Sequence, residues 1–133
     1  MIFNDSRELP KTFKDRKVCI MGLGFVGLTL AVTLADIGFE VYGIELRKDI
    51  VKKLRKGEPH FFEPGLEGRL KSQIKSKKLK IFQKIKKDFD VSIYIITVGT
   101  PIKKNNQVNK EMMERVCKEI SLFTKNDDLI ILR

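Results

Sequence analysis

The sequence has few of the residues that build metal sites, disulfide frameworks or histidine chemistry. Its 133 residues include two cysteines, Cys19 and Cys117, and one histidine, His60. Both cysteines lie inside apolar patterns without metal-ligand spacing, so we expect buried, reduced thiols and neither a disulfide nor a metal site. No nucleophile stands next to His60 in the sequence. We therefore favour a structural or exposed role for it over acid–base catalysis, which stays the alternative.

No stretch of the chain is long and apolar enough to favour a membrane span. The longest uncharged run, residues 18–35, is interrupted by three glycines, which weakens it as a transmembrane helix. Residues 1–17 mix acids and bases without an apolar core, so they do not resemble a secretory signal. We interpret residues 1–16 as a leader and residues 17–133 as one domain, and we expect a cytoplasmic protein without a membrane partner.

Acidic residues are missing from the most basic part of the chain, residues 68–87. The chain has 27 Lys and Arg against 17 Asp and Glu, a formal net charge of +10. Apolar residues recur through the basic stretch, which favours a solvated face that docks on the core. A nucleic-acid partner is not expected, because the stretch lacks the aromatic interleaving and the motifs of such sites. The nine basic residues are Arg69, Lys71, Lys75, Lys77, Lys78, Lys80, Lys84, Lys86 and Lys87.

Short apolar runs alternate with helical spacings along the rest of the chain. Strands alternating with helices favour right-handed crossovers. We therefore predict a Rossmann-type α/β fold, with a doubly wound, mainly parallel sheet of about five strands and helices on both faces. The predicted strands are residues 17–21, 40–44, 79–82, 91–98 and 129–132. The predicted helices are residues 25–37, residues 49–56, a segment with Pro64 in its first turn and Leu66, Leu70 and Ile74 on one face, and a segment from Met112 to Phe123.

A glycine motif stands between the first predicted strand and the first predicted helix. Gly22, Gly24 and Gly27 form the pattern G-x-G-x-x-G. Its first glycine permits a tight turn, its second lets a pyrophosphate approach, and its third brings the helix close to the strand. Free N–H groups at the helix start, at Phe25 and Val26, are expected to face the phosphates. The alternative is a turn that uses glycine for packing alone.

Two further segments extend the predicted dinucleotide site. Glu45 follows the second strand, where an acid binds the adenosine ribose hydroxyls. This acid favours NAD over NADP because it repels a 2′-phosphate, an effect that Arg47 and Lys48 oppose. A solvated strand-end acid is the alternative. Gly99-Thr100-Pro101 follows the fourth strand at its carboxyl end, where the ligand crevice of an open α/β sheet lies, although a plain turn also explains its glycine and proline.

Three motifs in this order resemble the nucleotide-sugar 6-dehydrogenases: Gly22-Leu-Gly-Phe-Val-Gly-Leu28, Glu63-Pro-Gly-Leu66 and Val98-Gly-Thr-Pro101. Residues 17–133 look like the N-terminal NAD-binding domain of the UDP-glucose/GDP-mannose dehydrogenase family. The resemblance implies a two-step, NAD-dependent oxidation of the C6 alcohol of a UDP- or GDP-sugar to a uronate, in a homo-oligomer that serves polysaccharide biosynthesis. The chain departs from the family at Ile50, where relatives commonly carry a basic residue five positions after the ribose-binding acid. We therefore expect Arg47, or alternatively Lys48, to supply any adenosine-phosphate contact.

The same resemblance implies that the catalytic cysteine belongs to a later domain. Neither Cys19 nor Cys117 has the neighbours of that nucleophile, so we expect no catalytic residue in this chain and no activity from the chain alone. The alternative is a stand-alone dinucleotide-binding or sensor module that docks a partner through the basic residues 68–87.

Overall fold

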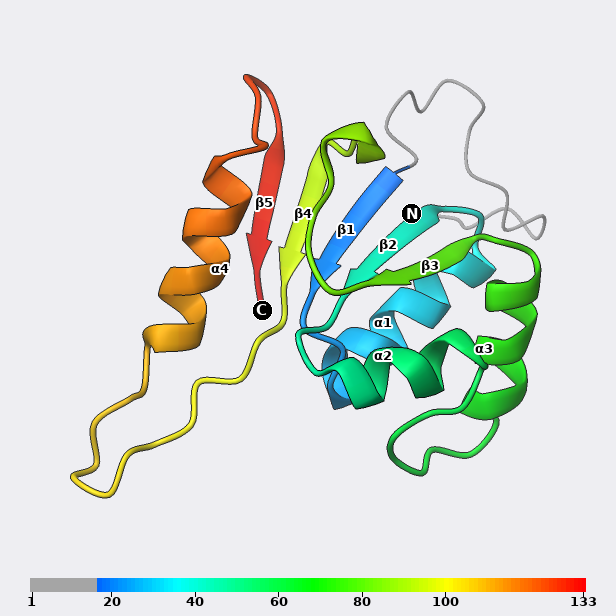
Figure 1. Cartoon of the computed structure of the whole chain (residues 1–133), viewed down its shortest axis with the longest axis horizontal. Helices are drawn as coiled ribbons and strands as arrows, with labels where there is room; N and C mark the ends of the chain where they lie inside the picture. The colour runs from blue at the N-terminus through cyan, green and yellow to red at the C-terminus, as the bar shows by residue number, and fades with distance from the viewer. Residues whose placement is uncertain (1–16) are drawn as a thin grey trace, which may run out of the picture.

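The computed structural model describes residues 17–133 (Figure 1). The predicted leader, residues 1–16, lies outside the described residues. The elements follow in the order β1 (Lys17–Met21), α1 (Phe25–Asp36), β2 (Glu40–Ile44), α2 (Lys48–Arg55), α3 (Leu66–Lys75), β3 (Leu79–Phe82), the 3-10 turn η1 (Lys87–Phe89), β4 (Ile93–Ile96), α4 (Glu111–Ser121) and β5 (Leu129–Leu132).

The five strands form one parallel sheet in the order β3-β2-β1-β4-β5. Figure 1 shows that all the arrows point to the same end of the sheet. The chain winds outward from β1 to β3 and then crosses to β4 on the other side of β1. Met21 pairs with Ile44 on β2 and with Ile96 on β4, so these three strands end level. Their carboxyl ends meet at the point where the strand order reverses, which is where open α/β sheets bind ligands.

Each strand of the sheet centre sends alternate side chains into two separate cores. Val18 and Ile20 of β1 pack with residues of α1, α2 and α3. Cys19 and Met21 face the opposite side, where they join a second core that includes Val116 of α4. Burial on both faces explains why these strands appear in the sequence as continuous apolar runs. The predicted Rossmann-type fold with helices on both faces is confirmed.

The start of α3 differs from the prediction. Pro64 lies in a turn before the helix, and Gly65 caps it in the left-handed conformation with φ of 78°. A residue with that φ cannot continue a right-handed helix, so the helix begins only at Leu66. Placing Pro64 in the first turn was therefore wrong. The fourth strand is also shorter than predicted and spans Ile93–Ile96.

The prediction of two buried thiols is confirmed for Cys19 and wrong for Cys117. Cys19 is fully buried in β1, whereas Cys117 is exposed on α4. The buried residues of α4 are Val116 and Ile120. Cys117 is turned by about 100° from Val116 around the helix, which brings its side chain to the solvent side.

Within residues 17–133, no helix combines the length and the apolar composition that crossing a membrane requires.

Candidate functional site

A cavity of about 300 Å³ lies at the carboxyl ends of β1, β2 and β4. The turn after β1, the residues that follow β2 and β4, and one face of α4 form its walls. Five of the residues predicted from the sequence line it: Gly22, Gly24, Glu45, Arg47 and Gly99. The fold thus brings together three segments that are far apart in the sequence.

The three glycines of the turn after β1 have different surroundings. Gly22 has φ of +97°, and a Cβ atom there would lie 3.0 Å from a Val98 methyl carbon. A Cβ atom on Gly27 would overlap the carbonyl oxygen of Gly22, so this glycine lets α1 pack against the turn. Gly24 has φ of −76°, and a Cβ atom there would meet no heavy atom within 4 Å. Packing therefore accounts for Gly22 and Gly27, whereas nothing in the fold requires glycine at position 24.

The start of α1 offers free backbone N–H groups beside this open space. Gly24 is the N-cap, no side chain caps it, and no acidic residue lies in the first helical turn. The first N–H groups of a helix have no partner within the helix, and the helix dipole favours an anion beside them. The side chains of Phe25 and Val26 are exposed and do not line the cavity. Only their backbone groups can contribute to the predicted site.

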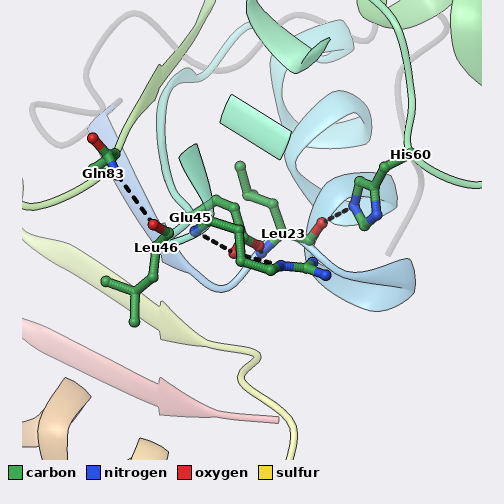
Figure 2. A network of polar contacts seen from close by, with 6 residues as sticks. Leu23, Glu45, Leu46, His60 and Gln83 are labelled. Carbon is green, nitrogen blue, oxygen red and sulfur yellow. Dashed lines mark hydrogen bonds and ion pairs between the residues drawn. The ribbon is translucent and has the colours of Figure 1, made fainter. Parts of the chain in front are cut away.

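Glu45 is buried, with 8% of its surface exposed. Its Oε2 accepts a hydrogen bond of 3.4 Å from the backbone N–H of Leu23, and its Oε1 accepts bonds of 3.2 Å from both the backbone N–H and the side-chain Nε of Arg47 (Figure 2). The alternative of a solvated strand-end acid is therefore wrong. Glu45 joins the glycine turn to the end of β2, and the Arg47 guanidinium lies directly beside its carboxylate.

The structure does not bring Thr100 and Pro101 to the cavity. Both are exposed, and the wall formed after β4 consists of Thr97, Val98 and Gly99. Thr97 has a defined role there, because its Oγ1 donates a hydrogen bond of 2.7 Å to the carbonyl oxygen of Gly22. This bond ties the end of β4 to the glycine turn. A polar residue at the end of an apolar strand run was the only sequence signal for it.

Sequence reasoning also missed residues that reach this region from distant segments. Arg115 and Glu119 of α4 line the cavity. His60, from the segment between α2 and α3, lies with its Nε2 at 2.6 Å from the carbonyl oxygen of Leu23. No local pattern in the sequence indicates these positions. Helix periodicity identified only the buried side of α4, and His60 belongs to no motif.

The cysteines supply no nucleophile to the cavity. Neither Cys19 nor Cys117 lines it. Burial raises the pKa of the Cys19 thiol, and the carboxylate of Glu119 adds to this effect, so the thiol stays protonated at neutral pH. Among residues 17–133, no cluster of three metal-ligating side chains is present.

The basic stretch of residues 68–87 is largely a solvent-exposed surface. Eight of its nine basic residues are exposed, and Lys80 is half-buried, as the predicted solvated face requires. Three of the nine are ion-paired: Arg69 with Asp36, Lys71 with Glu67, and Lys80 with Glu40. The hydrogen bond from Lys80 also holds the pKa of the Glu40 carboxyl below its usual value. These pairs reduce the charge that the surface offers to an acidic partner.

Comparison with known proteins gives one consistent family. The model of the UDP-glucose/GDP-mannose dehydrogenase family, NAD binding domain, matches residues 16–133. UDP-N-acetyl-D-mannosamine dehydrogenase of Pyrococcus horikoshii is 28% identical over 116 residues, which cover 87% of this chain and 28% of that protein. GDP-mannose 6-dehydrogenase of Pseudomonas putida is 36% identical over 113 residues, covering 83% of this chain and 25% of that protein.

Solved structures agree with the sequence comparison. The UDP-N-acetyl-mannosamine dehydrogenase Cap5O of Staphylococcus aureus superposes with a TM-score of 0.80 at 27% identity, over 87% of this chain and 28% of that one. A ternary complex of GDP-mannose dehydrogenase from Pseudomonas aeruginosa gives a TM-score of 0.77 at 30% identity, over 87% of this chain and 28% of that one. The chain spans less than a third of the length of each of these relatives.

Proposed function

Because the chain belongs to the UDP-glucose/GDP-mannose dehydrogenase family and forms its NAD-binding domain, we propose that the cavity at the ends of β1, β2 and β4 holds the dinucleotide. The observation that carries this proposal is Gly24. It lines the cavity at an uncapped helix N-terminus, where a Cβ atom would meet no protein atom within 4 Å. Such a cradle fits a pyrophosphate, which needs close backbone approach, unpaired N–H groups and the positive end of a helix dipole.

Each part of the site has a role in this proposal. The backbone N–H groups of Phe25 and Val26 bind the pyrophosphate, and the Glu45 carboxylate accepts hydrogen bonds from the adenosine ribose. Arg47 lies at the rim, where its guanidinium can contact a phosphate. Gly99 lines the wall after β4, and Thr100 with Pro101 continues that loop beyond the cavity. When NAD is bound, its nicotinamide accepts a hydride from the substrate.

We further propose that the whole protein oxidises the C6 alcohol of a UDP- or GDP-sugar to a uronate. The support is the naming of its relatives as UDP-N-acetyl-D-mannosamine, UDP-glucose and GDP-mannose dehydrogenases. A cytoplasmic location, a homo-oligomeric whole protein and a role in polysaccharide biosynthesis are parts of the same proposal.

The ribose-binding role of Glu45 predicts the cofactor preference of the chain. In the Glu45→Ala variant, NAD should bind about 10-fold to 100-fold more weakly, because a hydrogen bond to a charged group contributes about 1.5–3 kcal/mol. The freed Arg47 guanidinium can then contact a 2′-phosphate, so the affinity gap between NAD and NADP should narrow. Titration calorimetry with both dinucleotides measures this.

Glu45→Gln is the matched control, because it keeps the side-chain length and one acceptor oxygen while it removes the charge and replaces the other oxygen with an NH₂ donor. The glutamine variant should narrow the difference in affinity between NAD and NADP. Its loss of NAD affinity should be smaller than that of the alanine variant. A wild-type chain that binds NADP more tightly than NAD would contradict the assignment of Glu45.

The 133-residue chain by itself should form no NADH from any UDP- or GDP-sugar, even at saturating NAD. The buried Cys19 thiol has a raised pKa and neither cysteine lines the cavity, so the second oxidation has no covalent partner. The resemblance to the family places the residues that hold the sugar in a later domain, so this chain should also lack a contribution of about 7–11 kcal/mol from positioning. Absorbance of NADH at increasing sugar concentration checks this. Sugar-dependent turnover that survives Cys19→Ser and Cys117→Ser would place a catalytic site elsewhere, and turnover lost in either variant would identify that cysteine as catalytic.

A further inference from the structure

The segment between α2 and α3 contacts the glycine turn through His60. The Nε2 atom of His60 lies 2.6 Å from the carbonyl oxygen of Leu23 (Figure 2). A carbonyl oxygen can only accept, so the proton is on Nε2 and His60 is the donor. A second contact supports this approach, because the rings of Phe61 and Phe25 lie with their centroids 4.3 Å apart.

Leu23 is held at three points. Its side chain is fully buried, its backbone N–H donates to Glu45 Oε2, and its carbonyl oxygen accepts from His60. At the next residue, Gly24, the carbonyl oxygen accepts a hydrogen bond of 3.0 Å from the N–H of Leu28. Gly24 has no side chain, and no atom beyond its chain neighbours lies within 4 Å of its Cβ position. Glycine also has more backbone freedom than any other residue. The direction of the Gly24 N–H therefore depends on the Leu23–Gly24 peptide group, whereas the Gly24 carbonyl is held by α1.

His60 acts on Gly24 through the planarity of one peptide bond. The carbonyl oxygen of Leu23 and the N–H of Gly24 belong to the same planar trans group and point in opposite directions, and the described residues contain no cis peptide. A hydrogen bond that fixes the oxygen therefore fixes the N–H as well. Gly24 lines the cavity at the strand ends, whereas His60 lies outside it, beside a separate hollow formed with Phe61, Phe62 and α3.

We propose that His60 is a positioning residue for the dinucleotide: its Nε2–H holds the Leu23–Gly24 peptide so that the backbone amides at the start of α1 meet the pyrophosphate. This inference rests on the proposed function of the cavity and adds a residue that lies outside the glycine motif. It predicts that His60 contributes to the affinity for ligands that carry a phosphate and leaves the affinity for the nucleoside portion unchanged.

Two variants of His60 separate positioning from general packing. His60→Gln keeps an N–H donor at about the distance of Nε2, and His60→Met fills the space without a donor. With calorimetry or NMR titration, His60→Met should bind NAD about fivefold to tenfold more weakly, the ratio expected for one lost hydrogen bond. Its affinity for adenosine should stay within about twofold, and His60→Gln should recover most of the NAD affinity. Phe62→Leu changes an exposed residue of the same segment and should leave both affinities unchanged.

The spectra of the ligand-free variants supply a second readout. The Gly24 amide resonance should move in His60→Met and stay near its wild-type position in His60→Gln. Unchanged NAD affinity in His60→Met would overturn the inference, as would an equal loss for adenosine and NAD. If the wild-type chain binds no NAD, the proposed function fails, and the Gly24 resonance still decides whether His60 orients the turn: an unmoved resonance in His60→Met overturns the inference.

Discussion

A Gly24→Val variant should fold and lose about 100-fold or more in NAD affinity. The backbone at Gly24 is extended, with φ of −76° and ψ of −158°, a conformation that valine adopts readily. The added Cβ meets no protein atom within 4 Å, so the fold loses only the difference between glycine and valine at an N-cap, about 1 kcal/mol. The branched side chain occupies the space through which a pyrophosphate must approach the backbone.

Calorimetry measures the NAD affinity of the Gly24→Val variant, and urea denaturation measures its stability. Gly68→Val is the matched control, because Gly68 also has no atom within 4 Å of its Cβ position and lies on α3, outside the cavity. It should leave the NAD affinity unchanged. If Gly24→Val binds NAD as tightly as the wild-type chain, the glycine turn does not bind the pyrophosphate.

Gly27→Ala should destabilise the whole domain by about 2 kcal/mol or more. The added Cβ overlaps the carbonyl oxygen of Gly22 and comes to 2.6 Å from Thr97 Oγ1. Because the first of these is a backbone atom in a tight turn, α1 must move away from β1, and overpacking of this kind costs about 1–3 kcal/mol or more. The overlap with a backbone atom puts the cost at the upper end of this range, so the gain of about 1 kcal/mol from alanine in a helix offsets only part of it. A folded domain has about 5–15 kcal/mol of stability in total.

Urea denaturation followed by circular dichroism should show a much lower midpoint for Gly27→Ala. Gly24→Ala, three residues earlier in the chain, is the matched control, and its free energy of unfolding should stay within about 1 kcal/mol of the wild-type value. Equal midpoints for Gly27→Ala and the wild-type chain would show that α1 does not depend on close contact with the turn.

The parts of the fold that the sequence predicted well depend on local patterns. β1, β2, β3 and β5 have the predicted bounds, because each is a short run rich in apolar residues that ends at a polar residue or a glycine. Burial on both faces accounts for the runs of β1 and β2, whereas β5 is exposed. Pro64 was placed wrongly because the helix start depends on the backbone conformation of Gly65, which composition does not specify. Cys117 was placed wrongly because it neighbours the buried stripe of α4, and one residue turns the side chain to solvent.

The residues of the candidate site also fall into those that a local pattern predicts and those that it does not. Gly22, Gly24 and Glu45 were predictable because their spacing is fixed by one strand, one turn and the next strand. Thr97 and His60 contact the same turn from 75 and 37 residues away in the sequence. These contacts exist only because the topology places the end of β4 and the segment after α2 beside β1. Position in the sequence alone could not show that Gly99 lines the cavity while Thr100 does not.

The location of the NAD site is tested most directly by mapping backbone amide shifts of the wild-type chain during titration with NAD. The proposal predicts that the largest changes fall on residues 22–27 and 45–47, and that the exposed basic residues of 68–87 stay unchanged. Shifts gathered on residues 68–87, with the glycine turn unaffected, would contradict the proposed site and favour a docking surface on the basic face.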